Sequence, residues 1–284
     1  MARPGETRDR HPAMTEKPYF LQQGGERVFV MLHRPEGPCH GGAVLCAPLA
    51  EEKLWSHRVF VSLARELARA GYAVFRFDYR GEGDSDRNFE DSCLDTRIED
   101  TARAIDELRR QVAGNPDVTL IGLRLGASIA ALAAAGRKDV SRLVLWDPVT
   151  DGADYMQSVL RSNLMYQMAL HRKVVEDRET LLRRIDQGEL VNVEGYELGG
   201  PLFRQVSAIR LAELGLRPAV RSLIVSIAAQ ESPPRQDLVA LGARWNDATI
   251  ATAVEQPFWR EIRKFYNRAG NLFRVTTDWL DVKA

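Results

Sequence analysis

The sequence has little of what would direct a protein into a membrane or onto a nucleic acid. No uncharged apolar run is long enough to span a bilayer, and residues 1–17 are polar and lack the apolar core of a signal peptide. Lys+Arg and Asp+Glu both number 39, so the formal net charge is +0, and no long basic run is present. We therefore expect a cytoplasmic protein with no membrane span, no nucleic-acid partner and a disordered tail over residues 1–17.

Cysteine is also scarce. Cys39, Cys46 and Cys93 show neither C-x-x-C spacing nor an even set for disulfide pairing. This usage favours a reducing compartment and argues against a structural zinc site. We expect no metal and no cofactor. Because the net charge is zero, any partner has to be recognised by a local site, whether it is a small ligand, another protein or a second copy in a homo-oligomer.

What the chain does contain is an alternation of short apolar runs and amphipathic helical segments. An opening hairpin is expected across Gly24-Gly25 and a final helix from about Phe258. The alternation predicts an α/β fold, with a mostly parallel sheet covered by helices on both faces. The apolar runs lie at residues 42–47, 72–77, 118–121, 142–146, 222–227 and 248–253.

Residues 154–215 interrupt this alternation with helical segments and one extended turn. We interpret them as a helical lid inserted after the strand that ends at Trp146, so that the core comprises residues 18–153 and 216–284. Apolar side chains at helical spacing are expected to seal the lid onto the core or to line a pocket for an acyl chain. These are Met156, Met165, Tyr166 and Met168.

The most informative feature is the segment Gly122-Leu123-Arg124-Leu125-Gly126. It follows an apolar strand and leads into a helix of small residues over 127–135, which is the strand, sharp turn and helix that a G-x-S-x-G nucleophile elbow requires. Arg124 stands where a serine, cysteine or aspartate would attack. A guanidinium cannot lose a proton or attack a carbonyl near neutral pH, so this position does not supply a nucleophile.

A second motif supports the same fold. Asp78-Tyr-Arg-Gly-Glu-Gly-Asp-Ser85 resembles the D-x-R-G-x-G-x-S turn that follows the fourth strand of α/β-hydrolases. With the elbow frame and the inserted lid, the resemblance covers residues 18–284 and is closest to the serine-aminopeptidase-like branch. Residues 47–53 and 191–198 also resemble the exosortase-system-associated hydrolases that are encoded in bacterial exopolysaccharide clusters. The resemblance implies an α/β-hydrolase fold and an ester, thioester or amide hydrolase.

The residues do not supply the catalytic triad that this resemblance implies. The acid could be Glu231, after the run at 222–227, or Asp147, after the run at 142–146. The histidine should fall close to residues 255–258, where there is none. The five histidines are His11, His33, His40, His57 and His171. Both nucleophile and base are missing, which predicts a degenerate triad and a pseudoenzyme.

Two interpretations of Arg124 remain open. A buried guanidinium needs a negative partner, which could be Asp147, Glu231, Glu51 or Glu52 in an internal ion pair. Alternatively, Arg124 receives a carboxylate or phosphate of a ligand, helped by the positive end of the helix that follows it. The loop after the third strand should border the same pocket. The candidate ligand contacts are therefore Arg124, Leu125, Leu49, Glu51, Glu52 and Lys53.

Two functions follow from these residues. The first is a non-catalytic protein that binds a small anionic or acyl ligand, or acts as a partner subunit. The second is an unconventional hydrolase or acyltransferase for ester, thioester or amide substrates. In it a displaced group such as His57, with Glu51 or Asp147, activates water while Arg124 stabilises the oxyanion.

Overall fold

The apolar runs form the strands of one sheet. The computed structural model describes residues 13–112, 118–216, 220–260 and 266–281. The order of the eight strands is β1-β2-β4-β3-β5-β6-β9-β10, with the first two pairings antiparallel and the others parallel. The strands are β1 (Met14–Gln23), β2 (Glu26–Pro35), β3 (Gly41–Cys46), β4 (Tyr72–Phe77), β5 (Val118–Leu123), β6 (Val140–Trp146), β9 (Arg221–Ala228) and β10 (Ala248–Val254).

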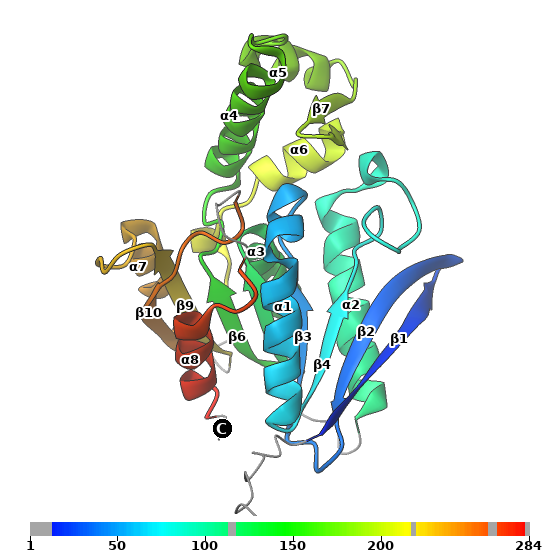
Figure 1. Ribbon diagram of the computed structural model, residues 1–284, viewed down its shortest axis with the longest axis vertical. Coiled ribbons are helices and arrows are strands. Elements are labelled where there is room, and N and C mark those ends of the chain that lie inside the picture. Colours follow the sequence, from blue (N-terminus) through cyan, green and yellow to red (C-terminus); the bar gives the residue numbers. More distant parts are fainter. Residues whose placement is uncertain (1–12, 113–117, 217–219, 261–265, 282–284) are drawn as a thin grey trace, which may run out of the picture.

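Helices cover both faces of this sheet, as predicted (Figure 1). On one face lie α1 (Glu51–Arg69), which packs on β4, and α8 (Gly270–Trp279), which packs on β9 and β10. On the other lie α2 (Leu94–Gln111), α3 (Leu125–Ala135) and α7 (Gln236–Gly242). A short 3₁₀ helix, η1 (Phe89–Asp91), precedes α2. The strands between these layers are almost wholly buried, which explains their nearly continuous apolar composition.

Between β6 and β9 the chain forms an insertion, which we define as residues 152–213. It rises above the carboxyl edge of the sheet at the top of Figure 1 and shares the hydrophobic core of the face that carries α2 and α3. Its elements are α4 (Gly152–His171), α5 (Arg178–Asp186), the antiparallel hairpin β7 (Val191–Val193) and β8 (Tyr196–Leu198), α6 (Gly200–Ser207) and the 3₁₀ helix η2 (Leu211–Glu213).

The predicted start of the ordered chain is wrong. Strand β1 begins at Met14 and pairs along its whole length with β2, so the last residues of the expected tail belong to the sheet. Polarity misleads here because an edge strand can be solvated on one face while its backbone is satisfied by its neighbour. Glu16, for example, binds Arg65 of α1 at 2.7 Å. The rest of the expected tail, residues 1–12, lies outside the described residues.

The final helix also begins later than predicted, at Gly270 rather than near Phe258. Phe258 and Trp259 form a turn with buried side chains, closed by the bond from the Arg260 N–H to the Pro257 carbonyl. The predicted inward positions at 262 and 265 lie outside the described residues. Phe258 and Trp259 therefore belong to a turn after β10 and not to the final helix.

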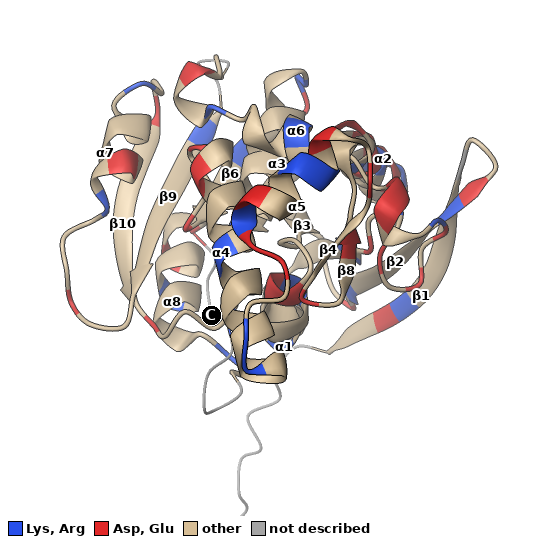
Figure 2. Cartoon of the chain, turned by 90° about the horizontal axis from the view of Figure 1, so that it is seen from above, with Lys and Arg blue, Asp and Glu red and all other residues tan. Residues whose placement is uncertain are grey.

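Charged residues are spread over the molecule. Seen from above, basic and acidic positions are interspersed over the helices and loops (Figure 2). Within the part of the chain that the structure describes, no helix combines the length and apolar character needed to cross a bilayer. The same residues hold no group of three or more His, Cys, Asp or Glu side chains arranged for a metal ion.

Candidate functional site

Arg124 occupies the sharp turn between β5 and α3, where the sequence places it. Its φ of 53° and ψ of −122° are strained for a residue with a side chain, and such values persist only where the surroundings impose them. The flanking glycines permit the close backbone packing that holds the turn in this conformation. A Cβ on Gly126 would stand 2.3 Å from the Cys46 carbonyl oxygen, and one on Gly122 would stand 2.5 Å from the Ala127 nitrogen. The turn thus holds the Arg124 side chain at the carboxyl edge of the sheet.

The Arg124 guanidinium is paired inside the protein. Its Nε donates to Glu52 Oε1 at 3.2 Å, and its Nη1 donates to Asp147 Oδ2 at 3.0 Å and to the Asp147 carbonyl at 3.2 Å. The side chain is only 12% exposed. Burial by itself would lower the pKa of Arg124, but the charges of Glu52 and Asp147 outweigh it and raise the pKa. The residue is therefore a permanent cation with two carboxylate partners.

Two aromatic rings complete the surroundings of Arg124. The ring centroids of Tyr155 and Trp259 each lie 5.6 Å from its guanidinium carbon, within the range of a cation–π contact. Tyr155 comes from α4 of the insertion, and its hydroxyl donates to Glu52 Oε2 at 3.0 Å. Trp259 follows β10, close to the place where the resemblance puts the catalytic histidine. Neither ring was identified from the sequence; the position of Trp259 beside residues 255–258 was the one available signal.

Asp147 bridges two arginines. It is 4% exposed, and its Oδ2 accepts from Arg124 and, also at 3.0 Å, from Nη1 of Arg235. Arg235 in turn pairs with Asp237 at 2.7 Å. The Oδ1 of Asp147 is buried and makes no hydrogen bond with the described residues. One of the two acids predicted from the sequence therefore lies at the elbow, and its charge is held by guanidinium groups.

Glu52 is the other carboxylate at this site. Burial raises its pKa, while the charge of Arg124 and hydrogen bonds from Arg124 and Tyr155 act in the opposite direction. Its neighbour Glu51 turns to the insertion hairpin: burial, followed by the charge of Glu51, raises the pKa of Tyr196 to about 12. The first turn of α1 thus contacts both the elbow and the insertion.

Other predicted residues lie elsewhere. Lys53 pairs with Asp78 at 2.7 Å and Glu82 at 3.1 Å, so it serves the turn after β4. His57 is exposed on α1, and burial followed by the charge of Arg76 lowers its pKa. Glu231 is exposed in the loop after β9. Leu49 and Leu125 are buried at the ends of the segments that flank the elbow.

The Asp78–Ser85 turn is held by ion pairs and short hydrogen bonds. Arg80 binds Asp100 at 2.7 Å and Glu99 at 2.8 Å, both on α2. The Ser85 hydroxyl donates to the Asp78 carbonyl at 2.6 Å. These contacts fix the turn against α2.

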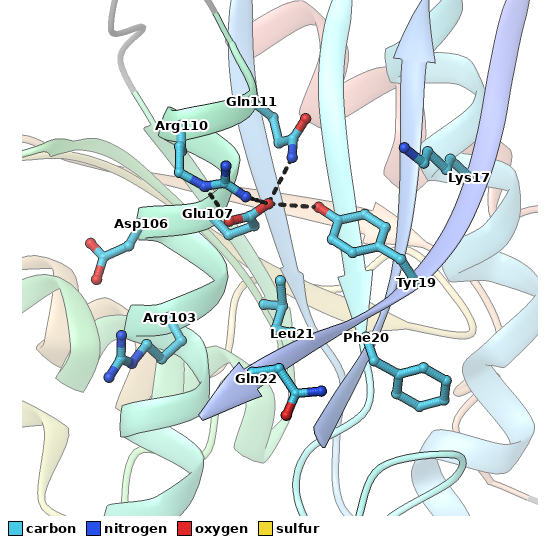
Figure 3. A pocket seen from close by; sticks show the side chains of 10 residues that line it. All are labelled: Lys17, Tyr19, Phe20, Leu21, Gln22, Arg103, Asp106, Glu107, Arg110 and Gln111. Carbon is cyan, nitrogen blue, oxygen red and sulfur yellow. Dashed lines mark hydrogen bonds and ion pairs between the residues drawn. The ribbon is translucent and has the colours of Figure 1, made fainter. Parts of the chain in front are cut away.

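A separate cavity of about 520 Å³ lies between β1 and α2, away from the elbow (Figure 3). Its wall is dominated by Glu107, which accepts hydrogen bonds from Tyr19 at 3.2 Å and from Arg110 and Gln111 at 2.7 Å. Glu107 and Arg110 thus pair with each other. The cavity belongs to the edge of the sheet and brings no further group to Arg124.

Comparison with known proteins supports the fold. A family model described as serine aminopeptidase, S33, matches residues 54–192. No curated protein matches the chain. Among solved structures, the chain is similar to Est1E from Butyrivibrio proteoclasticus with ferulic acid bound (TM-score 0.64, 17% identity, 92% of this chain and 97% of that one).

It is also similar to alpha/beta hydrolase domain-containing protein 10 from mouse, with a TM-score of 0.60 at 16% identity over 93% of this chain and 98% of that one. A thioesterase domain from the curacin biosynthetic pathway gives a TM-score of 0.54 at 16% identity over 95% and 99%. At these identities the likeness concerns the fold, and the predicted α/β-hydrolase fold is confirmed.

Proposed function

We propose that the chain is a non-catalytic member of the α/β-hydrolase superfamily that binds a small ligand or acts as a partner subunit. The observation that carries the proposal is the pairing of Arg124 with Glu52 and Asp147 at the nucleophile position. A guanidinium with a raised pKa offers no lone pair for attack on a carbonyl. Trp259, which has no basic nitrogen, stands beside it.

The pairing also favours one class of ligand. Arg124 and Arg235 are balanced by Glu52 and Asp147, so a carboxylate or phosphate would have to displace one of these acids to reach the guanidinium. An uncharged acyl group needs only the aromatic surroundings that Tyr155 and Trp259 provide. Of the anionic and acyl ligands that the sequence allows, we therefore propose the acyl class.

The narrower subgroup is proposed on the resemblance of two segments that lie in contact through Glu51 and Tyr196. Residues 47–53 and 191–198 carry the resemblance to the exosortase-system-associated hydrolases, and this contact joins the two segments. The two segments that resemble the subgroup therefore lie next to each other in the structure. We include membership of it in the proposal.

A second candidate function is hydrolysis or acyl transfer by displaced residues. The serine aminopeptidase model and the similarity to a thioesterase domain favour it. His57 lies outside the elbow cluster, so Glu52, whose pKa is raised by burial, is the carboxyl placed to accept a proton beside Arg124. In this version Arg124 would have to leave its present partners to stabilise an oxyanion.

The two functions differ in turnover, and labelling tests for a conventional serine nucleophile. The purified protein is incubated with a fluorophosphonate probe and with p-nitrophenyl esters from acetate to octanoate. An active serine esterase is the positive control. We expect neither labelling nor saturable turnover. Turnover that is lost in Arg124→Ala and Glu52→Gln, but kept in the exposed control Arg58→Ala, would contradict the proposal and support hydrolysis. Circular dichroism confirms that each variant is folded.

Ligand class is tested with two molecules that differ in charge. Thermal unfolding is followed with octanamide and with octanoate, and we expect octanamide to raise the melting temperature more. A larger rise with octanoate would show that the site prefers an anion. If neither ligand changes the melting temperature, the small-ligand half of the proposal is wrong and the partner-subunit half remains.

A further inference from the structure

The far end of the insertion exposes a cluster of apolar side chains. We call residues 165–175 the tip; they comprise the end of α4 and the loop after it, at the top of Figure 1. Met165 is 71% exposed, Leu170 60% and Val175 57%. Tyr166, Met168 and Val174 are also exposed. The expectation that Met165, Tyr166 and Met168 seal the lid or line a pocket is therefore wrong, because α4 projects beyond the core at this end.

The loop of the tip is held in one conformation. Gln167 is buried, and its Oε1 accepts the backbone N–H of Val175 at 2.7 Å and of Glu176 at 2.9 Å. Its Nε2 donates to the Glu176 carbonyl at 3.2 Å. These three bonds fix the loop backbone, so the side chains of Val174 and Val175 are held outward. Exposed apolar groups on a fixed support mark an interaction surface more often than a packing defect.

The charges within the tip are of one sign. Residues 155–175 contain no Asp or Glu, whereas Arg161, Arg172 and Lys173 are exposed and form no ion pair with any residue of the described ranges. The acids that follow are engaged, since Glu176 binds Arg184 at 2.6 Å and Asp177 caps α5. The tip is therefore an apolar surface with basic side chains that no acid of the described residues neutralises.

Arg172 adds a backbone argument. It ends α4 in the left-handed conformation, with a φ of 58°, where glycine is the usual residue. A side chain at such a position costs about 1 kcal/mol, and the benefit of Arg172 to the fold is small because no ion pair with the described residues compensates for it. The Arg172 side chain is therefore available to an anion outside the described residues.

We propose that the tip docks onto an anionic lipid bilayer. Apolar side chains surround the convex end of α4, an arrangement that a deformable acyl region can cover, whereas a protein partner would need an acidic groove of matching shape. A second copy in a two-fold contact would bring Arg172 and Lys173 against the same cations. Basic residues next to inserted apolar groups are attracted to anionic head groups. The inference goes beyond the proposed function and does not depend on it.

The test is cosedimentation of the full-length protein with lipid vesicles. We expect binding to phosphatidylcholine vesicles that contain phosphatidylglycerol, little binding to phosphatidylcholine alone, and weaker binding as salt is raised. The double variant Arg172→Gln with Lys173→Gln should weaken binding about 30-fold. Each basic residue near an anionic surface contributes a factor of about five to the affinity. The matched control is Arg58→Gln with Lys138→Gln, at exposed basic positions away from the tip.

The apolar contribution is tested in the same assay. Met165→Ser with Leu170→Ser should reduce binding strongly, while Val239→Ser, an exposed valine on α7, should leave it unchanged. Failure of the wild-type protein to bind anionic vesicles, or equal binding by the tip variants, overturns the proposal. Self-association that the Met165→Ser variant abolishes would overturn it as well, and would assign the tip to a second copy.

Discussion

Arg124 shows how one substitution determines the chemistry of its neighbours. A buried guanidinium is stable only with acids beside it, and the sequence offers four candidates. Glu52 and Asp147 are the partners because they follow β3 and β6, the two strands that flank β5 in the sheet. Glu231 follows β9, which lies one strand further away. The sequence identifies Arg124 as the cation at the elbow, whereas its acidic partners depend on the order of the strands.

Replacing Arg124 by methionine should make stability depend more strongly on pH. Burial holds the pKa of Glu52 above its ordinary 4.5, and loss of the Arg124 charge raises it further. A carboxyl with a raised folded-state pKa stabilises the protein below its unfolded-state pKa, and this contribution is lost as pH rises through the folded-state value. We expect Arg124→Met to lower the free energy of unfolding by about 3 kcal/mol at about pH 8 and by less at about pH 5.

Urea denaturation at the two pH values measures this difference. Arg58→Met, which replaces an exposed arginine on α1, is the control and should show little change at either pH. An equal deficit at both pH values would mean that Glu52 does not carry the effect. A loss of unfolding free energy that is larger at the acidic pH would contradict a raised pKa for Glu52 in the variant.

At the scale of elements, the elbow was predictable because glycine spacing fixes it locally. The strand, the turn at Arg124 and the helix after it agree with the sequence prediction. The N-terminus of α2 is less well predicted. The capping-box pattern from Thr96 to Glu99 predicts a helix that opens at Thr96, but α2 begins at Leu94 and Thr96 bonds back to Cys93, the residue before the helix. Several neighbouring residues can each act as the cap of a helix. The exact first residue of a helix is therefore harder to predict than the presence of the helix.

The close packing of α3 on β3 gives a prediction at this scale. A Cβ on Gly126 would lie 2.3 Å from the Cys46 carbonyl oxygen and 2.4 Å from that of Ala47, and neither backbone atom can move cheaply. We expect Gly126→Ala to lower the free energy of unfolding by at least about 2 kcal/mol. Gly136→Ala, at the other end of α3, meets nothing within 4 Å and should change it by less than about 1 kcal/mol. Equal effects in urea denaturation would show that this contact does not constrain the elbow.

At the scale of the whole molecule, the insertion is fastened to the core through α1. Tyr155 of α4 binds Glu52, and Tyr196 of β8 contacts Glu51, so adjacent residues of one helical turn hold two parts of the insertion. Burial, followed by the charge of Glu52, raises the pKa of Tyr155 well above its ordinary value, so its hydroxyl remains a donor at neutral pH. The carboxylate that neutralises Arg124 therefore also holds the insertion above it.

Removing this hydroxyl should loosen the insertion. Tyr155→Phe loses a hydrogen bond to a charged acceptor, which we expect to cost about 1.5 kcal/mol and to speed hydrogen exchange in residues 152–213. Tyr166→Phe changes an exposed tyrosine of the same helix and should leave exchange unaltered. Exchange is followed by mass spectrometry of peptides. Unchanged uptake in Tyr155→Phe would show that apolar packing alone holds the insertion.

The sequence by itself determined the α/β order of the core, the insertion after Trp146 and the cation at the elbow, because apolar periodicity and glycine spacing act over a few neighbouring residues. It left the partners of Arg124 open and did not identify Tyr155 or Trp259. It also predicted that Met165, Tyr166 and Met168 of the tip seal the lid or line a pocket. Those features were decided by tertiary structure, because strand order, the path of the insertion and the reach of α4 beyond the core depend on contacts between residues far apart in the chain.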